Sequence, residues 1–428
     1  MARRLNSKDG SFAAEFEALL TSRAGAEDDV AREVKAIIAD VRKRGDAALV
    51  ELTNKFDRAN VTHETLKLSA ADLDVAVGRE QLAAIEVAAT RIEAYHRKQL
   101  PQDADFTDAS GARLGWRWTA VDSVGLYVPG GTAAYPSSVL MNAIPAKVAG
   151  VVRIAMVTPA SGGKTNPLVL AAAKRAGVTE IYRIGGAQAV AALAYGTASI
   201  KPVDKIVGPG NAWVAAAKRE VFGQVGIDSI AGPSEILVIA DGGNDPEWIA
   251  ADLLSQAEHD ASSQSILITD DAAFADKVAI AAERALATLP RREIVSRSWN
   301  DHGGIIVVEN LEDAVALSDR FAPEHLEIAT NDPRALLAKV RHAGAIFLGK
   351  HTPEAMGDYI AGPNHVLPTS RSARFSSGLS VLDFMKRTTL LSLDEGAMKA
   401  LGPDAITLAE AEGLEAHARS IAARLNRK

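Results

Sequence analysis

Short apolar runs that lead through turns into helical patterns constrain the fold of this chain more than any other feature. Three such runs lie in the middle of the chain, and glycines follow the second and third of them. The runs are 151–157, 180–184 and 205–207, and the helical patterns after them are 167–176, 188–195 and 211–222. Repetition of strand, turn and helix predicts βαβ units and a mostly parallel sheet.

A second series of the same kind follows. Apolar runs at 235–240, 265–269, 304–308 and 343–348 alternate with helical patterns at 246–259, 272–289 and 311–321. A chain of 428 residues is also too long for a single hydrophobic core. We therefore predict an α/β fold of two Rossmann-like α/β domains with mostly parallel sheets, plus small helical extensions at both ends.

The chain contains no cysteine, which excludes disulfides, cysteine-ligated zinc and thiolate nucleophiles. Its net charge is −7 and it has no block of Lys and Arg, so a nucleic-acid groove is disfavoured. No apolar run reaches the ~18 residues of a membrane helix, and no apolar segment of a signal peptide follows the basic start. We expect a soluble cytoplasmic protein with neither a nucleic-acid nor a membrane partner.

The first candidate site lies at the end of the helix predicted for 246–259. Gln256 and His259 are three residues apart there, so they share a helix face and can hold a metal ion from one side. The alternative is a polar helix end, where a charged His favours the helix dipole.

A second candidate is the pair Glu324 and His325, which follows Pro323 and precedes a predicted buried strand at 326–329. Neighbouring side chains of an extended chain point in opposite directions, so the two would serve two separate proton transfers. The alternative is a solvated acid–imidazole pair.

Two further segments bring acids and imidazoles together. The segment 356–369 contains two Gly and two Pro and is predicted to be a shaped loop that carries Asp358 and His365, although Asp358 can also form an Asx turn. The segment 408–417 carries Glu412 and His417 where a C-terminal helix begins. The acids Glu410 and Glu415 there can be explained by the helix dipole alone.

Nitrogen and oxygen side chains without any Cys suit zinc, and Mn or Co could replace it. A zincin hydrolase is disfavoured because no pair has the His-Glu-x-x-His spacing. The remaining histidines lie in contexts typical of the surface, and we interpret them as structural or solvated. They are His63, His96, His302, His342 and His351.

No G-x-G-x-x-G fingerprint follows a strand, so the usual dinucleotide motif is absent. Three strand-to-helix turns remain at which backbone N–H groups can meet a phosphate. They are Tyr127 before Gly130-Gly131, Gly185-Gly186 before Gln188, and Gly208-Pro209-Gly210 before Asn211. Such turns are common in α/β proteins and indicate a nucleotide only weakly.

Taken together, these segments resemble the histidinol dehydrogenase family over nearly the whole chain. The motifs are Tyr127–Gly131, Gly185–Ala189, Gly208–Asn211, Ala231–Glu235, Ser255–His259, Ala322–Glu327, Gly362–Thr369 and Glu412–His417. The resemblance implies a homodimer of intertwined subunits that oxidises L-histidinol through L-histidinal to L-histidine with one zinc per subunit and two NAD, in the last steps of histidine biosynthesis.

The resemblance also implies roles for individual residues. Zinc would be held by Gln256, His259, Asp358 and His417, and it would orient the substrate. His325 would take the alcohol proton, and Glu324 would activate water for attack on the aldehyde. The substrate would contact Ser234, His325, His365 and Glu412 as well as the zinc ligands. NAD would contact Tyr127, Gln188 and Asn211.

The expected domains follow from these patterns. Residues 1–22 form an N-terminal helical extension, and 23–126 with 235–379 form the main α/β domain that holds the metal site. Residues 127–234 form an inserted cofactor-binding α/β domain. Residues 380–428 show only helical periodicity, and we expect them to reach the partner subunit and complete a shared active site.

The absence of Cys adds a chemical argument. Many aldehyde oxidations proceed through a Cys thiohemiacetal, so this chain must use a hydrated aldehyde and needs one base for the alcohol and another for water. Three alternatives remain: a related zinc- and NAD-dependent dehydrogenase acting on another small polyol, a metal-dependent hydrolase, and a non-catalytic metal-binding assembly protein.

Overall fold

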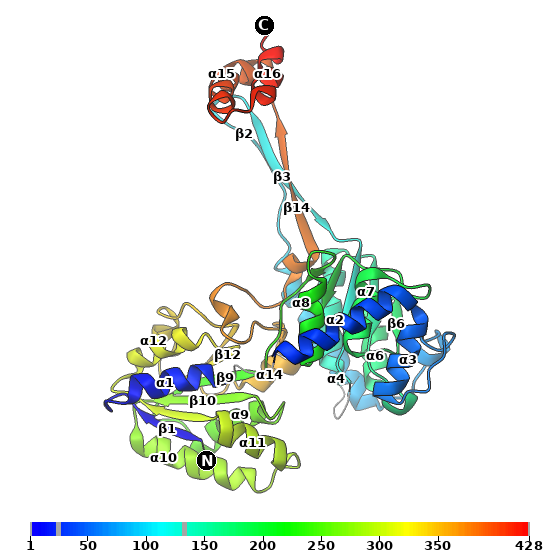
Figure 1. The fold of residues 1–428 in the computed structure, drawn as a ribbon. Helices are drawn as coiled ribbons and strands as arrows, with labels where there is room; N and C mark the ends of the chain where they lie inside the picture. The colour runs from blue at the N-terminus through cyan, green and yellow to red at the C-terminus, as the bar shows by residue number, and fades with distance from the viewer. Residues whose placement is uncertain (1, 23–26, 131–134, 427–428) are drawn as a thin grey trace. The chain divides into compact units, whose positions relative to one another are not determined.

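The computed structural model describes residues 2–22, 27–130 and 135–426, without the side chains of residues 27 and 28. Gly131, the last residue of the Tyr127–Gly131 motif, lies outside this part. The chain forms two compact units (Figure 1). The first consists of Met1–Gln99 and Asp122–Phe384, and the second of Leu100–Val121 and Met385–Lys428. Among the described residues, no helix is both long and apolar enough to cross a lipid bilayer.

The first unit contains a five-stranded parallel sheet, here called sheet I, in the order β6-β5-β4-β7-β8. Its strands are β4 (Ser123–Tyr127), β5 (Arg153–Val157), β6 (Glu180–Tyr182), β7 (Lys205–Val207) and β8 (Gly226–Ile227). Counted along the chain this order is 3-2-1-4-5, the doubly wound arrangement, in which the winding reverses between β4 and β7.

In the part of the chain that the structure describes, seven α-helices accompany sheet I. They are α2 (Glu27–Arg44), α3 (Asp46–Asp57), α4 (Arg79–Arg97), α5 (Pro136–Ala149), α6 (Pro167–Ala176), α7 (Gly186–Tyr195) and α8 (Ala212–Val221). Helices α2, α3, α7 and α8 share one hydrophobic core with inward side chains of the sheet, while α4, α5 and α6 pack against one another.

The packing of α2 and α3 differs from the expectation that residues 23–126 join the domain with the metal site. Val34 of α2 and Leu49 of α3 lie in the core of sheet I, together with Val157 and Val190. An apolar stripe shows which face of a helix is buried, but not which sheet covers that face. The domain boundaries near residues 126 and 234 stay predictions.

The first unit also contains a six-stranded parallel sheet, sheet II, in the order β1-β11-β10-β9-β12-β13. Its strands are β1 (Arg3–Asn6), β9 (Glu235–Ala240), β10 (Gln264–Thr269), β11 (Gly304–Val307), β12 (His325–Ala329) and β13 (Ala345–Leu348). Strands β9 to β13 repeat the order 3-2-1-4-5, and β1 adds one edge strand. The prediction of only a helix in 1–22 missed β1, because four residues are too few to show a period.

Helices cover both faces of sheet II (Figure 1). They are α1 (Phe12–Thr21), α9 (Pro246–Ala257), α10 (Ala272–Leu286), α11 (Arg292–His302), α12 (Leu311–Phe321) and α13 (Pro333–Leu337). Alternate side chains of β9 enter two different cores. Ile236 and Val238 pack with α9, α10 and α11, whereas Leu237 and Ile239 pack with α1, α12 and α13.

Short helices complete the first unit. They are the α-helix α14 (Glu354–Tyr359) and the 3-10 helices η1 (Ala71–Leu73), η2 (Ser161–Gly163), η3 (Ser372–Arg374) and η4 (Val381–Phe384). The segment 356–369 was predicted to be a loop throughout, but its first residues belong to α14. Asp358 therefore lies in the last turn of a helix and not in an Asx turn.

The second unit is a three-stranded antiparallel sheet with two helices. Its strands are β2 (Ala104–Thr107), β3 (Arg113–Ala120) and β14 (Met385–Ser392), and its helices are α15 (Glu395–Ala411) and α16 (Glu415–Arg424). The expectation of helix alone after residue 380 was wrong for β14. This strand pairs with β3, far away in the sequence, so no local pattern reveals the pairing. The predicted fold class of α/β with parallel sheets is confirmed.

Candidate active site

The amino ends of strands β9 and β12 hold a tightly bonded group of acids. Glu235 is the first residue of β9, and Glu324 directly precedes β12. The backbone N–H of Glu235 donates to Glu324 Oε2 at 2.9 Å, and the backbone N–H of Glu324 donates to Glu235 Oε2 at 3.2 Å. This reciprocal pair of hydrogen bonds holds both carboxyl groups at the start of two neighbouring strands.

His325, the first residue of β12, is buried beside this pair with 3% of its surface exposed. Its Nδ1 lies 2.9 Å from the backbone oxygen of Glu235. Because a carbonyl oxygen can only accept, Nδ1 carries the proton and Nε2 is the basic nitrogen of the neutral ring. Nε2 has no hydrogen-bond partner among the described residues and lies 3.6 Å from Asp358 Oδ1.

Glu324 and His325 influence each other's pKa. Burial raises the pKa of Glu324 to about 8, although the charge of His325 opposes this shift. Burial alone would lower the pKa of His325. The charges of Glu324, Glu354 and Asp358 and the close contact with Asp358 outweigh burial and raise this pKa well above its usual value. Both groups therefore release their protons above their usual pH range, so their basic forms are favoured at mildly alkaline pH.

A possible metal-binding group lies next to His325. One ligand atom each of His259, Glu354 and Asp358 lies within 4.8 Å of the others, and His259 Nε2 is 4.0 Å from Asp358 Oδ2. Burial would raise the pKa of Asp358, but the close contact with His325 and the charges of neighbouring histidines lower it to about 2. Asp358 is therefore an anion at neutral pH, the form that binds a cation.

Gln256 lies in the last turn of α9, three residues before His259. Its side chain is fully buried, and neither its Oε1 nor its Nε2 has a hydrogen-bond partner among the described residues. A buried amide without a partner is costly, and a cation at its oxygen would remove that cost. The oxygen and nitrogen donors of Gln256, His259 and Asp358 thus fit zinc.

Two more predicted residues border the site. His365 donates from Nδ1 to the backbone oxygen of Asp358 at 2.9 Å, and its Nε2 lies 3.3 Å from Ser138 Oγ. These contacts connect the end of α14 to helix α5. Ser234 directly precedes β9 and is partly exposed, and its backbone oxygen accepts from the N–H of Gln264.

The predicted cofactor residues lie at the carboxyl edge of sheet I. Tyr127 ends β4, and its phenol oxygen accepts from the N–H of Gly186 at 2.9 Å where α7 begins. Burial raises the pKa of Tyr127 to about 12, so the phenol keeps its proton. Gly186 has φ +64°, and a Cβ there would lie 2.8 Å from Oε1 of the buried Gln188. The positive φ favours glycine at this turn.

The third turn follows β7, next to β4 at the reversal point of sheet I. Gly208 has φ +116°, and a Cβ there would lie 2.1 Å from the backbone oxygen of Tyr127. Asn211 caps α8 by accepting from the N–H groups of Trp213 and Val214. In doubly wound sheets the crevice at this point binds nucleotides, with phosphate at a helix start. The arrangement fits a dinucleotide.

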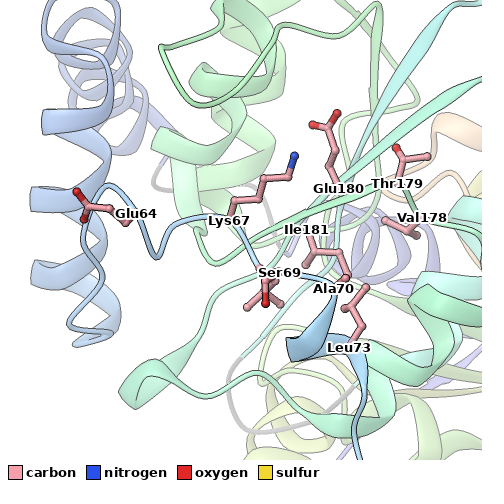
Figure 2. Close-up of a pocket in the computed structure, with 10 residues that line it drawn as sticks. Glu64, Lys67, Ser69, Ala70, Leu73, Val178, Thr179, Glu180 and Ile181 are labelled. Carbon is pink, nitrogen blue, oxygen red and sulfur yellow. The ribbon is translucent and has the colours of Figure 1, made fainter.

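Figure 2 shows a depression in the first unit. It is lined by residues of the segment 64–73 and by residues at the start of β6, among them Lys67 and Glu180. Glu180 already accepts hydrogen bonds from Nε and Nη2 of the Arg153 guanidinium, at 3.0 and 3.1 Å. None of the predicted site residues lines this depression.

Known proteins resemble this chain in both sequence and structure. The family model of histidinol dehydrogenase matches residues 20–425. The histidinol dehydrogenase of Rhizobium meliloti (strain 1021) is 64% identical over 429 residues, with 100% of this chain and 99% of the relative covered. That of Rhodospirillum rubrum is also 64% identical, with the same coverage. The crystal structure of histidinol dehydrogenase from Elizabethkingia anophelis matches with a TM-score of 0.94 at 36% identity, covering 99% of this chain and 98% of that one.

The chain belongs to the histidinol dehydrogenase family.

The first unit thus brings together most of the site residues that resemblance to histidinol dehydrogenases had suggested. His259 and Asp358 meet beside Glu324 and His325, and Gln256 lies buried three residues before His259. Glu412 and His417 lie in the second unit, where both are exposed and His417 is in the first turn of α16. Their contribution to the site stays a prediction.

One expectation about the remaining histidines was wrong. His96 was placed in a surface-like context, but it is fully buried, and its Nδ1 lies 2.7 Å from the backbone oxygen of Ile92. Burial lowers its pKa. Its role is structural, as expected, because its other ring nitrogen lies 3.4 Å from the Asn364 amide. His96 continues the buried stripe of α4 that Ile85, Ala88, Ala89 and Ile92 form, so the helical period is a signal that could have been used.

Sequence reasoning missed two acids of the site. Glu235 is a charged residue at the start of an otherwise apolar buried strand, and that contrast is a signal that could have been used. Glu354 looks like an acid in the first turn of a helix, for which the dipole is a sufficient explanation. Only its burial and its place in the metal-binding group set it apart.

Proposed function

We propose that this chain oxidises L-histidinol through L-histidinal to L-histidine, with one zinc and two NAD. The coarser part rests on family membership: the chain is a histidinol dehydrogenase, an oxidoreductase of histidine biosynthesis. The observation that supports the two oxidation steps and the zinc is the buried His325. It is hydrogen-bonded to the backbone of Glu235 and lies next to the metal-binding group that contains His259 and Asp358. The proposal places the enzyme in the cytoplasm.

In this proposal His325 removes the alcohol proton through Nε2. The hydrogen bond from Nδ1 to Glu235 holds the ring in the tautomer with a free Nε2. The ring has little freedom to turn, because it is buried and its neighbours are strand residues. A base held in one orientation within reach of the substrate hydroxyl is what general base catalysis requires.

Glu324 serves the second oxidation. An aldehyde must first be hydrated, because the chain has no Cys with which to form a thiohemiacetal. Burial raises the pKa of Glu324 to about 8, so the carboxylate that takes a proton from water is favoured at mildly alkaline pH. The bond from the Glu235 N–H keeps one carboxyl oxygen in place and leaves the other for water.

Gln256, His259 and Asp358 would hold zinc in the first unit, with His417 as the fourth ligand. When bound, zinc supplies a fixed positive charge that orients the substrate's imidazole and amino nitrogens and offsets the surrounding carboxylates. Ser234, His365 and Glu412 would contact the substrate. Tyr127, Gln188 and Asn211 would border NAD, the acceptor of the two hydrides.

We further propose an intertwined homodimer in which His417 and Glu412 act in the partner's site. The second unit exposes large apolar side chains that a monomer would leave in water. They are Phe106, Leu390, Leu391, Leu401, Leu408 and Leu414. An apolar surface of this kind is typical of a subunit interface.

The decisive experiment measures NADH formation by the purified protein with L-histidinol. We expect two equivalents of NADH per substrate, and loss of activity after chelation that zinc restores. One equivalent would contradict the two-step reaction, and no NADH would contradict the dehydrogenase. Activity with another small polyol but not with histidinol would favour the related dehydrogenase.

Mixed dimers test the shared site. Neither His417→Ala nor His325→Ala should be active alone, but a mixed population should regain about a quarter of the wild-type activity if sites are completed across subunits. The reason is that half of the dimers are mixed and one site in each mixed dimer carries neither substitution. No recovery on mixing would contradict the shared site.

A further inference from the structure

The buried ion pair of Lys218 and Asp228 lies outside every residue assigned a role above. Lys218 is on the inner face of α8, Asp228 follows β8, and their side chains are 2% and 4% exposed. Such a pair usually contributes little to stability, because removing two charges from water offsets their attraction. Apolar side chains would fill this space at lower cost, so the pair needs another explanation.

The partners of the pair supply that explanation. Asp228 Oδ2 accepts from the N–H of Gly208 at 2.7 Å, and Lys218 Nζ donates to the carbonyl oxygen of Gly208 at 3.0 Å. Both backbone groups of one glycine are thus bound by the two ends of one ion pair. Asp228 is itself held in place, because its Oδ1 accepts from the N–H of Ser229 at 2.7 Å.

Gly208 lies where the backbone leaves no room for a side chain. With φ +116° it is in a conformation that other residues rarely adopt, and it lies against the backbone of Tyr127. The turn it begins leads through Pro209 and Gly210 to Asn211, the cap of α8. The orientation of this turn therefore depends on how the Gly208 peptide groups are held.

We propose that Lys218 and Asp228 are positioning residues that bracket Gly208 and hold the 208–211 turn ready for the dinucleotide. This inference rests on the proposed function, since it takes the turn to border NAD. The pair does not touch the cofactor. The ion pair keeps the turn in one conformation, so that cofactor binding does not have to order the turn.

The test uses the double substitution Lys218→Met with Asp228→Asn. Lys218→Met alone would leave Asp228 buried without its cation and could unfold the protein, whereas the neutral pair avoids a buried lone charge. The matched control is Arg153→Met with Glu180→Gln, which removes another ion pair of sheet I, at the amino ends of β5 and β6.

Two measurements report on the turn directly. Without nucleotide, amide hydrogen exchange in peptides covering 207–214 should be faster in the double variant than in the wild type or the control. In fluorescence titrations the Kd for NADH should rise about tenfold in the double variant and stay within about twofold in the control.

Kinetics then separates positioning from general damage. The KM for NAD should rise about tenfold while kcat and the KM for histidinol stay within about twofold, because chemistry and zinc binding occur at sheet II. A folded double variant with wild-type affinity for NADH would overturn the inference, and so would an equal loss in the control. If the wild type itself formed no NADH from histidinol, the proposed function would fail instead.

Discussion

Sheets I and II have the same strand order, but their predicted site residues lie at opposite edges. In sheet I, Tyr127 and the Gly208 turn follow the carboxyl ends of β4 and β7. In sheet II, Glu235, Glu324 and His325 lie at the amino ends of β9 and β12, the strands in the corresponding positions. A shared topology therefore does not determine which edge is used.

At the carboxyl edge of sheet II, hydrogen bonds occupy the position that corresponds to the glycine turns of sheet I. Asn244 Nδ2 donates to the backbone oxygen of Ala329 at 2.6 Å, and the N–H of Asn331 donates to Asp241 Oδ2 at 2.7 Å. These bonds close the reversal point between β9 and β12. Sheet I keeps glycines at that point and can offer backbone N–H groups, whereas the site at sheet II is made of side chains.

The largest expected effect is that of His325→Asn, which removes the base at sheet II. We expect kcat with histidinol to fall about 10³-fold, the range of general base catalysis, and the KM for NAD to stay within about twofold. Steady-state kinetics with both substrates checks this. A large rise in the KM for NAD would show that the two edges do not act separately.

Glu324→Gln should slow the two oxidation steps to different extents. Oxidation of histidinal should slow about 100-fold, and oxidation of histidinol to the aldehyde much less, because only the former needs activated water. Single-turnover measurements starting from each substrate distinguish the two steps. Equal losses in both steps would exclude a specific role in activating water.

Gln256→Leu should weaken zinc binding about 100-fold without lowering the stability of the protein lacking metal. The substitution removes two buried polar atoms that have no partner among the described residues. Zinc titration gives the affinity, and the melting temperature with and without zinc gives the linkage. A variant that is less stable without metal would mean that Gln256 has a structural role.

Gly208→Ala should raise the KM for NAD about tenfold and lower the melting temperature, because its Cβ would collide with Tyr127. Gly223→Ala is the matched control in the same sheet. Gly223 also has positive φ, +101°, but a Cβ there meets nothing within 4 Å. The control should lose some stability and keep its KM. An equal rise in KM for both would assign the effect to backbone strain alone.

The smallest expected effect concerns the amino edge of sheet I. The hydrogen bond from Arg153 holds the pKa of Glu180 at about 2, below its ordinary value of 4.5. The stabilisation is therefore present above pH 4.5 and is lost as the pH falls toward 2. Glu180→Gln should cost about 1 kcal/mol at neutral pH.

Denaturant unfolding of Glu180→Gln and wild type across this pH range measures the difference. Activity should not change, since no predicted site residue lies at this edge. A difference in unfolding free energy that stayed constant down to the lowest pH would contradict the ion pair as its cause.

The sequence by itself determined the α/β class, because strand and helix periods are local and recur along the chain. It also supplied the predicted site residues, since Gln256, His259, Glu324, His325 and Asp358 stand in motifs that resemble those of the family. The sequence did not show where the strand order of each sheet reverses, or at which edge the predicted site residues lie. Strand order depends on contacts between segments that are distant in the sequence.

Tertiary structure alone decided the details on which the chemistry depends. Glu235 and Glu324 are 89 residues apart, and their reciprocal bonds exist only because β9 and β12 are neighbours. Strand β14 pairs with β3, and α2 packs on sheet I, for the same reason. A hydrogen bond or a buried face needs a partner, and the identity of a distant partner is a property of the fold and not of the local sequence.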